Sequence, residues 1–140
     1  MQFQLISAGG VKFDGEAYEV LVPTQGGTIA LFAGHMQLIS AGAPGVLSVR
    51  KKNSDNDEKM QRFAVYGGVV QVDGKSARFI TDDVTEPHEV SEAESQKALQ
   101  RAEDLVASAG SREELHEARR VQVHHEVRLH LAQLKTRHHR

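Results

Sequence analysis

The sequence predicts a mainly β protein with an α-helical end: a β-sandwich or barrel of about seven to ten short strands, followed by an antiparallel two-helix hairpin. Three observations predict this class. Short alternating apolar runs, separated by turn residues, fill the chain up to about residue 81. After Pro87 the apolar period becomes that of a helix. Two Ser-x-x-Glu boxes, each typical of a helix start, open the two segments that Gly110 separates.

The first part of the chain alternates between strand-like runs and turns. The expected strands are Phe3–Ile6, Glu16–Val22, Thr28–Phe32, Met36–Ser40, Val46–Arg50, Met60–Tyr66, Val69–Val72 and Ala77–Thr81. The expected turns and breaks are Ala8-Gly9-Gly10, Pro23 to Gly27, Gly34-His35, Pro44-Gly45, a solvated tip over 51–59, Gly67-Gly68 and Asp73-Gly74. No helix-length segment separates the strands, which argues against a parallel sheet.

The second part predicts two helices. Ser91 and Glu94 form a capping box, and apolar residues then recur at helical spacing up to Gly110, a C-terminal stop. Ser111 and Glu114 form a second box, which opens a helix expected to end near Lys135.

The second helix carries two apolar stripes. The first consists of Leu115, Ala118, Leu129 and Ala132, and the second of Val123, Val127, Leu131 and Leu134. One stripe is enough to pack on the first helix. Because a buried Leu or Val contributes ~1.5–3 kcal/mol, we expect the second stripe to pack on the sandwich or on another chain.

Composition excludes several classes of site. The chain has no Cys, so a disulfide framework, a thiolate metal site and a Cys nucleophile are absent. Apolar runs are too short to span a bilayer, and the start resembles no signal peptide, so we expect a soluble cytoplasmic protein. Residues 86–110 carry 2 basic and 6 acidic side chains, whereas residues 111–140 carry 7 basic and 4 acidic ones. The second helix should therefore favour an acidic neighbour.

Catalytic and metal patterns fail on spacing. His125-Glu126 begins an H-E-x-x-H pattern, but residue 129 is Leu, so no metal site is expected. Gly74-Lys75-Ser76 resembles the end of a phosphate-binding loop, but position 69 is Val and strands flank the tripeptide, which favours a hairpin turn. We expect no catalytic residue and no cofactor.

Two further groups of charged residues do not form a functional site. The Asp82-Asp83 pair lacks the unlike environments that acid–base catalysis needs. Arg50-Lys51-Lys52 is followed at once by acidic residues, so nucleic-acid binding is not expected.

Five motifs in order resemble one family. Residues 13–23, FDGEAYEVLVP, are similar to the opening F-S-G-E strand of the epsilon subunit of the rotary, F-type ATP synthase. Residues 26–40, GGTIALFAGHMQLIS, resemble its G-E-L-G-I-x-P-G-H-x-P-L-L-T segment. Its P-G strand, its S-G-G strand and its A-D-T exit match Pro44-Gly45-Val46, residues 66–72 and Thr81-Asp82-Asp83.

The resemblance implies two domains: a ten-stranded β-sandwich stalk domain over residues 1–86, and a helical hairpin regulatory domain over residues 87–140. It implies a non-catalytic central-stalk subunit that couples rotation of the membrane c-ring to the catalytic head through the gamma subunit. Such a protein is peripheral on the cytoplasmic face of the bacterial plasma membrane, and its membrane contact is indirect. In this family the helical domain lies folded on the sandwich or extends into the head, where it inhibits ATP hydrolysis.

The resemblance also assigns contact residues. Thr28, Gly34 and His35 match the part of the family sequence nearest the c-ring, although Thr28 replaces a glutamate. On the second helix, the residues expected to meet a partner, including an acidic loop of the catalytic beta subunit, are Arg119, Arg120, Val123, Val127, Arg128, Leu131 and Lys135. An alternative for the basic side chains is that they merely complement the acidic first helix.

A nucleotide motif of some bacterial members is altered here. The positions of its I/L-D-x-x-R-A pattern hold Val90, Ser91, Glu94 and Ser95, without the Asp and the Arg, and only Arg101 matches a further basic position. The substitutions predict no ATP binding, or very weak binding. Two alternatives to a stalk subunit remain: a stand-alone nucleotide-responsive binding module, and a structural adaptor that shares only the sandwich.

Overall fold

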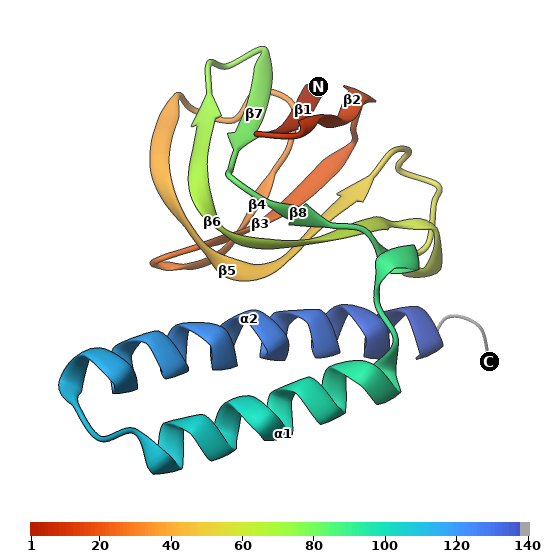
Figure 1. Cartoon of the computed structure of the whole chain (residues 1–140). Helices are drawn as coiled ribbons and strands as arrows, with labels where there is room; N and C mark the ends of the chain where they lie inside the picture. Colours follow the sequence, from red (N-terminus) through yellow and green to blue (C-terminus); the bar gives the residue numbers. More distant parts are fainter. Residues whose placement is uncertain (138–140) are drawn as a thin grey trace. The chain divides into compact units, whose positions relative to one another are not determined.

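The computed structural model describes residues 1–137, with side chains as far as residue 135. The chain divides into two compact units, Met1–Val84 and the part from Thr85 onward. The first unit is built of β-strands (Figure 1). The strands are β1 (Gln2–Ser7), β2 (Gly10–Glu16), β3 (Glu19–Thr24), β4 (Gly27–Leu31), β5 (Leu38–Arg50), β6 (Gln61–Val72), β7 (Ser76–Ile80) and β8 (Val84–Thr85).

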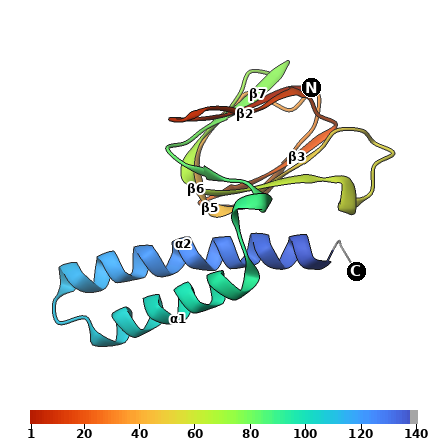
Figure 2. The same cartoon turned by 45° about the vertical axis from the view of Figure 1, so that its right-hand side comes forward.

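The β-sandwich is one sheet folded over on itself. Its strand order is β2-β1-β7-β6-β5-β3-β4, with β8 added beside β6. The long strands β5 and β6 pair along their whole length, but β7 pairs only with the end of β6 and β3 mainly with the end of β5. Each of the two long strands therefore contributes to both layers of the sandwich. The interior lies between the two layers (Figure 2).

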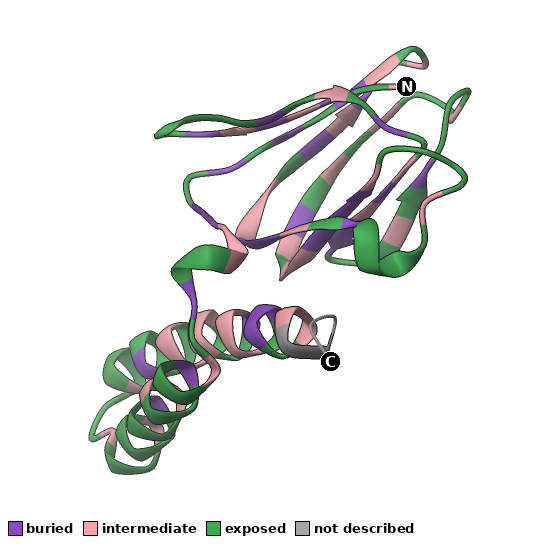
Figure 3. Ribbon diagram, turned by 90° about the vertical axis from the view of Figure 1, so that its right-hand side faces the viewer, coloured by how far each residue is buried: buried purple, intermediate pink, exposed green. Residues whose placement is uncertain are grey.

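The core fills that interior with alternate residues of the strands. In β1, Phe3 and Leu5 are fully buried, whereas Gln2 is exposed. Figure 3 shows this alternation of buried and exposed segments along the strands. The core cluster consists of Phe3, Leu5, Phe13, Ala17, Val20, Val22, Leu31, Leu47, Val49, Phe63, Val65, Val70, Val72, Ala77, Phe79 and Val84.

The ring of Phe79 occupies the place where β5 and β6 pass from one layer to the other. An added Cβ on Gly42 would lie 2.6 Å from Phe79 Cζ, and one on Gly68 would lie 2.8 Å from Phe79 Cε1. Gly68 has a φ of +147°, which a residue with a side chain rarely adopts. The two facing glycines therefore leave a flat seat for a ring that is fully buried.

The structure corrects the strand count and two predicted breaks. The sheet has eight strands rather than ten. Pro44-Gly45 does not turn the chain, and Gly67-Gly68 does not end a strand, because both pairs lie inside β5 and β6. These residues bend the paired strands without interrupting their register, since Gly42 pairs with Gly68 and Pro44 with Tyr66.

The segment predicted as one strand, Glu16–Val22, is two. β2 ends at Glu16, and β3 begins at Glu19. The prediction also missed β2 itself, which pairs with β1. Pro23 does not stop β3: it pairs with Thr28 of β4, and the register between β3 and β5 shifts between Leu21 and Thr24. The irregularity accommodates a residue that has no N–H to donate.

Arg50 organises the exposed tip between β5 and β6. Its Nη2 lies 2.6 Å from Asp57 Oδ1, its Nε lies 3.4 Å from Glu19 Oε1, and its Nη1 donates to the Asp55 carbonyl at 2.7 Å. The carboxylates raise the pKa of Arg50 further above its ordinary value. The tip, expected to be solvated, includes the short 3-10 helix η1 (Asp57–Lys59), which has no buried residue.

The second unit begins with a 3-10 helix, η2 (Pro87–Glu89), followed by α1 (Glu92–Ser108) and α2 (Arg112–Arg137). The predicted caps form in part. Ser91 Oγ accepts the Glu94 N–H at 3.4 Å, and Ser111 Oγ accepts the Glu114 N–H at 3.1 Å. The Glu114 carboxylate binds the N–H of Gly110 at 2.8 Å. The two helices run antiparallel (Figure 1), and neither described helix is both long and apolar enough to cross a membrane.

The close packing of Phe79 on Gly42 predicts that one added methyl group at Gly42 destabilises the β unit. Gly42→Ala should lower the free energy of unfolding of the β unit by about 1–3 kcal/mol, because the ring must move against a packed core. Urea unfolding followed by far-UV circular dichroism measures the change. The matched control is Gly26→Ala, where the nearest atom to the new Cβ is Thr24 Oγ1 at 4.0 Å, and the expected change is below about 0.5 kcal/mol. Equal stability of the two variants would contradict the role of Gly42.

Candidate functional site

The Gly34-His35 corner lies at the end of β4, an edge strand of the sheet. Gly34 is exposed and has a φ of +84°, a conformation that favours glycine. His35 is half-buried: its N–H donates to the Phe32 carbonyl at 3.1 Å, and its Nδ1 lies 2.8 Å from the Met36 carbonyl. Two large apolar side chains are exposed on either side of the corner, Phe32 at 39% and Met36 at 76%.

Thr28 does not join the corner in one cluster. It is exposed near the start of β4, whereas Gly34 and His35 follow the other end of that strand. The three residue steps from Thr28 to Leu31 span roughly 10 Å. The predicted ring-facing residues therefore lie along one edge of the sheet, and their role as a contact stays a prediction.

One exposed apolar surface of the β unit was missed from the sequence. Ala41 of β5 pairs with Val69 of β6, which pairs with Ile80 of β7, which pairs with Ile6 of β1. Ile39 lies two residues before Ala41 on the same face. We call these residues, Ile6, Ile39, Ala41, Val69 and Ile80, the outer apolar row. Ile39 is 76% exposed, Val69 39% and Ile80 38%.

A sequence pattern marks this row. Four neighbouring strands each contain two consecutive apolar residues: Leu5-Ile6, Leu38-Ile39, Val69-Val70 and Phe79-Ile80. Successive side chains of a strand point to opposite faces, so one member of each pair must face outward. Contiguous exposed apolar side chains on a sheet mark an interaction surface.

The four cations predicted on α2 fall into two classes. Arg119 and Arg120 are exposed, and Arg120 Nη2 lies 2.7 Å from Glu117 Oε1 on the same helix. Arg128 and Lys135 are half-buried and donate hydrogen bonds to the start of the same unit. The structure therefore leaves only the first two facing solvent.

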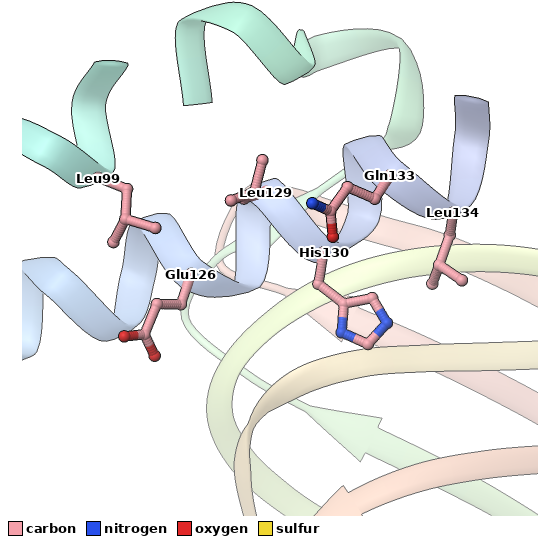
Figure 4. Close-up of a pocket in the computed structure, with 6 residues that line it drawn as sticks. All are labelled: Leu99, Glu126, Leu129, His130, Gln133 and Leu134. Atoms are coloured by element: carbon pink, nitrogen blue, oxygen red, sulfur yellow. The ribbon is translucent and has the colours of Figure 1, made fainter. Parts of the chain in front are cut away.

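The predicted apolar contact residues of α2 also differ from one another. Val123 is 38% exposed, whereas Val127 and Leu131 are buried. A groove of about 310 Å³ lies between the helices, with one lining residue on α1 and five on α2 (Figure 4). Its lining consists of Leu99, Glu126, Leu129, His130, Gln133 and Leu134.

A second, polar groove of about 420 Å³ is lined by Ser91, Glu94, Ser95 and Arg101, four of the five residues that match the nucleotide motif. Its lining consists of Ser91, Glu94, Ser95, Lys97, Ala98, Arg101, His124, His125 and Arg128. Three permanent cations and one carboxylate line it, so the cations oppose the repulsion that Glu94 would exert on a phosphate group. The absence of ATP binding stays a prediction.

His125 lines this groove and is half-buried. Burial lowers its pKa, and the positive charges of Arg128 and Arg101 lower it further. Its Nδ1 is buried and has no hydrogen-bond partner among the residues that the structure describes. Protonation of His125 would add a charge to a site that already holds cations.

The phosphate-loop interpretation of Gly74-Lys75-Ser76 is excluded by geometry. The tripeptide turns β6 into β7, and Asp73 Oδ1 accepts the N–H groups of Lys75 at 2.9 Å and Ser76 at 2.7 Å. These hydrogen bonds lower the pKa of Asp73. Among the described residues, no three His, Asp or Glu side chains are placed to share a metal ion.

The chain is similar to known proteins in sequence and in fold. Residues 1–87 match the family model described as ATP synthase, Delta/Epsilon chain, beta-sandwich domain. The ATP synthase epsilon chain of Latilactobacillus sakei is 28% identical over 119 residues, covering 85% of this chain and 81% of that protein. That of Bordetella avium is 28% identical over 115 residues, covering 82% and 79%.

Two solved structures share the fold. A chain of the Euglena gracilis mitochondrial ATP synthase, OSCP/F1/c-ring in rotational state 1, matches with a TM-score of 0.77 at 19% identity, covering 89% of this chain and 76% of that chain. A chain of the Tetrahymena thermophila mitochondrial ATP synthase, central stalk and c-ring, matches with a TM-score of 0.66 at 16% identity, covering 94% and 96%.

The environment of His125 predicts acid sensitivity of the helical unit. The pKa of His125 in the folded chain is below the value of about 6.5 that it has when unfolded. Below about pH 6.5 the unfolded chain binds a proton at His125 that the folded chain does not. The free energy of unfolding should therefore stay constant above about pH 6.5 and fall as the pH drops toward the pKa of His125 in the folded chain. Thermal melts at 222 nm from about pH 8 to about pH 5 measure this.

The matched variants are His125→Gln and His116→Gln, the latter at an exposed position of the same helix. His125→Gln should flatten the pH dependence, and His116→Gln should leave it unchanged. An unaltered slope in His125→Gln would show that another group carries the acid sensitivity.

Proposed function

The chain belongs to the ATP synthase delta/epsilon chain family, and on that premise we propose that it is a non-catalytic central-stalk subunit of a proton-translocating ATP synthase. The match of the family's β-sandwich model to residues 1–87 carries the proposal. The helical hairpin that follows and the similarity to epsilon chains over 85% of this sequence support it. Such a subunit transmits rotation and has no active site of its own.

The outer apolar row is the docking face that we assign to the gamma subunit. A stalk subunit must stay fixed to its neighbour while torque passes through it, which favours burial of rigid apolar side chains at the contact. Ile39, Val69 and Ile80 stand on three hydrogen-bonded strands rather than on loops, so their positions are held by the sheet. Ile39 alone exposes enough apolar surface to contribute ~1.5–3 kcal/mol when buried.

The edge of the sheet that contains Thr28, Gly34 and His35 is the surface we assign to the c-ring. Thr28 near the start of β4 and Gly34 beyond its end are exposed there, and Met36 extends the apolar part of the edge. This contact would hold the protein at the cytoplasmic face of a bacterial plasma membrane without inserting it. Thr28 would contribute a neutral hydroxyl to this surface.

The helical unit is assigned a regulatory role. In an extended conformation, α2 would present Arg119 and Arg120 to an acidic loop of the catalytic beta subunit and so oppose ATP hydrolysis. Both side chains face solvent, which supports their availability. Exposed ion pairs contribute only ~0–1 kcal/mol each, so several must act together to favour the inhibited state.

Introducing one charged side chain into the outer apolar row tests whether this row is the docking face. Ile39→Asp should reduce copurification of the gamma subunit and c-ring by about tenfold, because a carboxylate replaces a buried apolar side chain at the contact. The matched control is Leu105→Asp, an exposed leucine of α1. Far-UV circular dichroism should show unchanged folding in both. Undiminished copurification with Ile39→Asp would reject this docking face.

Regulation is tested by removal of α2. A chain that ends at Gly110 should assemble with the other stalk subunits and raise the rate of ATP hydrolysis by the assembled enzyme several-fold, because the segment assigned to the head is missing. Hydrolysis is measured with a coupled assay at equal enzyme concentration. An unchanged rate in a fully assembled complex would mean that the hairpin is structural.

A further inference from the structure

We propose that the C-terminal end of α2 is a clasp: it holds residues 85–91, here called the linker, and keeps Arg128 and Lys135 from any acidic partner while it is closed. The second consequence rests on the proposed function, because it concerns the cations assigned to a partner. The clasp itself is a property of the free chain.

The lengths of the two helices create the clasp. α1 has 17 residues and α2 has 26, so at ~1.5 Å per residue α2 is longer by about 13 Å. A three-residue connection joins the helices, which run antiparallel, so the excess length of α2 extends past the beginning of α1 (Figure 1). The linker arrives at that point, and the end of α2 packs on linker residues instead of on α1.

Lys135 makes the central contact. Its Nζ donates to the carbonyl oxygens of Val90 at 3.1 Å and Pro87 at 3.2 Å. The turn of η2 brings the two carbonyls together, because the Val90 N–H donates to the Pro87 carbonyl at 3.3 Å. A half-buried ammonium with two carbonyl acceptors makes charge-assisted hydrogen bonds, which are roughly twice as strong as neutral ones.

Arg128 makes the second contact, at the other end of the linker. Its Nη1 donates to Thr85 Oγ1 at 3.3 Å. Arg128 and Lys135 are seven residues apart, about two helical turns, so they lie on one face of α2, and Leu131 lies between them on that face. Leu131 is 1% exposed and Val90 is 5% exposed, so the hydrogen bonds lie beside apolar side chains that are shielded from water.

Because of this geometry, Arg128 and Lys135 can bind either the linker or an acidic partner, but not both at once. The donors of Lys135 that reach the Val90 and Pro87 carbonyls cannot also bind a partner's carboxylates without leaving the linker. Arg119 and Arg120, which face solvent, are available in both conformations. An acidic partner would therefore gain its first contacts from Arg119 and Arg120, and would gain Lys135 and Arg128 only by opening the clasp. Such competition makes the capture of α2 conditional on release of the linker.

Amide hydrogen exchange in the free, full-length chain tests the clasp. Lys135→Met keeps the aliphatic stem and removes the charge and the donors. Exchange at the Glu89 and Val90 amides should become about tenfold faster, because the turn of η2 loses its anchor. The matched control is Arg120→Met, which removes an exposed cation whose partner, Glu117, lies on the same helix, and exchange of the linker should not change.

A second variant keeps the test decisive if Lys135→Met lowers helicity. Arg128→Met should accelerate exchange mainly near residues 85 and 86, so the two variants should mark opposite ends of the linker. Unchanged linker exchange in both variants, with helicity retained, would overturn the clasp. Faster exchange in Lys135→Met, combined with unchanged ATP hydrolysis by the assembled enzyme, would retain the clasp and overturn its regulatory use.

Discussion

The fully buried ring of Phe79 lies on the glycine pair Gly42 and Gly68, and the arrangement of the β unit depends on that contact. Two strands can pass from one layer of a sandwich to the other only if they bend together and the bend is filled. Glycine on both strands allows the bend, and an aromatic ring from β7 fills it. Because β5 and β6 are continuous through this place, the two layers are one sheet, and a disturbance here would reach both.

The same continuity decides which face of the sheet carries exposed apolar residues. The inner faces of β5, β6, β7 and β1 are committed to the core, so the outer face is free to carry a second set of apolar residues in register. Ile39, Val69 and Ile80 form that set together with Ala41 and Ile6. A rigid sheet holds them in place, which suits a subunit that must transmit force without deforming.

In the helical unit, polar contacts rather than a packed apolar core join the C-terminal end of α2 to the linker. Two cations of α2 are satisfied by the chain itself, through carbonyl and hydroxyl oxygens that α1 does not supply. The groove with His125 adds a site where the positive charges of Arg128 and Arg101 lie near a half-buried imidazole.

Much of the architecture followed from the sequence by itself, because local rules decide it. Alternation and turn residues located most of the strands, Asp73-Gly74 marked a tight hairpin, and Ser91, Gly110 and Ser111 marked the helix ends. The family was evident from motifs in register. By contrast, Pro44-Gly45 and Gly67-Gly68 were read as breaks, because glycine and proline weaken a strand locally, and only pairing with a partner strand shows that they bend it.

The sequence predicts a strand end at Pro23 for the same reason. The register shift between β3 and β5 allows this proline inside β3, and that shift appears only in the paired strands. The contact residues needed the tertiary structure most. Thr28 and Gly34 are close in sequence but lie toward opposite ends of β4, whereas Ile39 and Ile80 are far apart in sequence and share one face. Charge pattern alone placed Arg119, Arg120, Arg128 and Lys135 in one class. Only the folded chain separates two that face solvent from two that it uses itself, because hydrogen bonds to distant carbonyls leave no trace in local sequence.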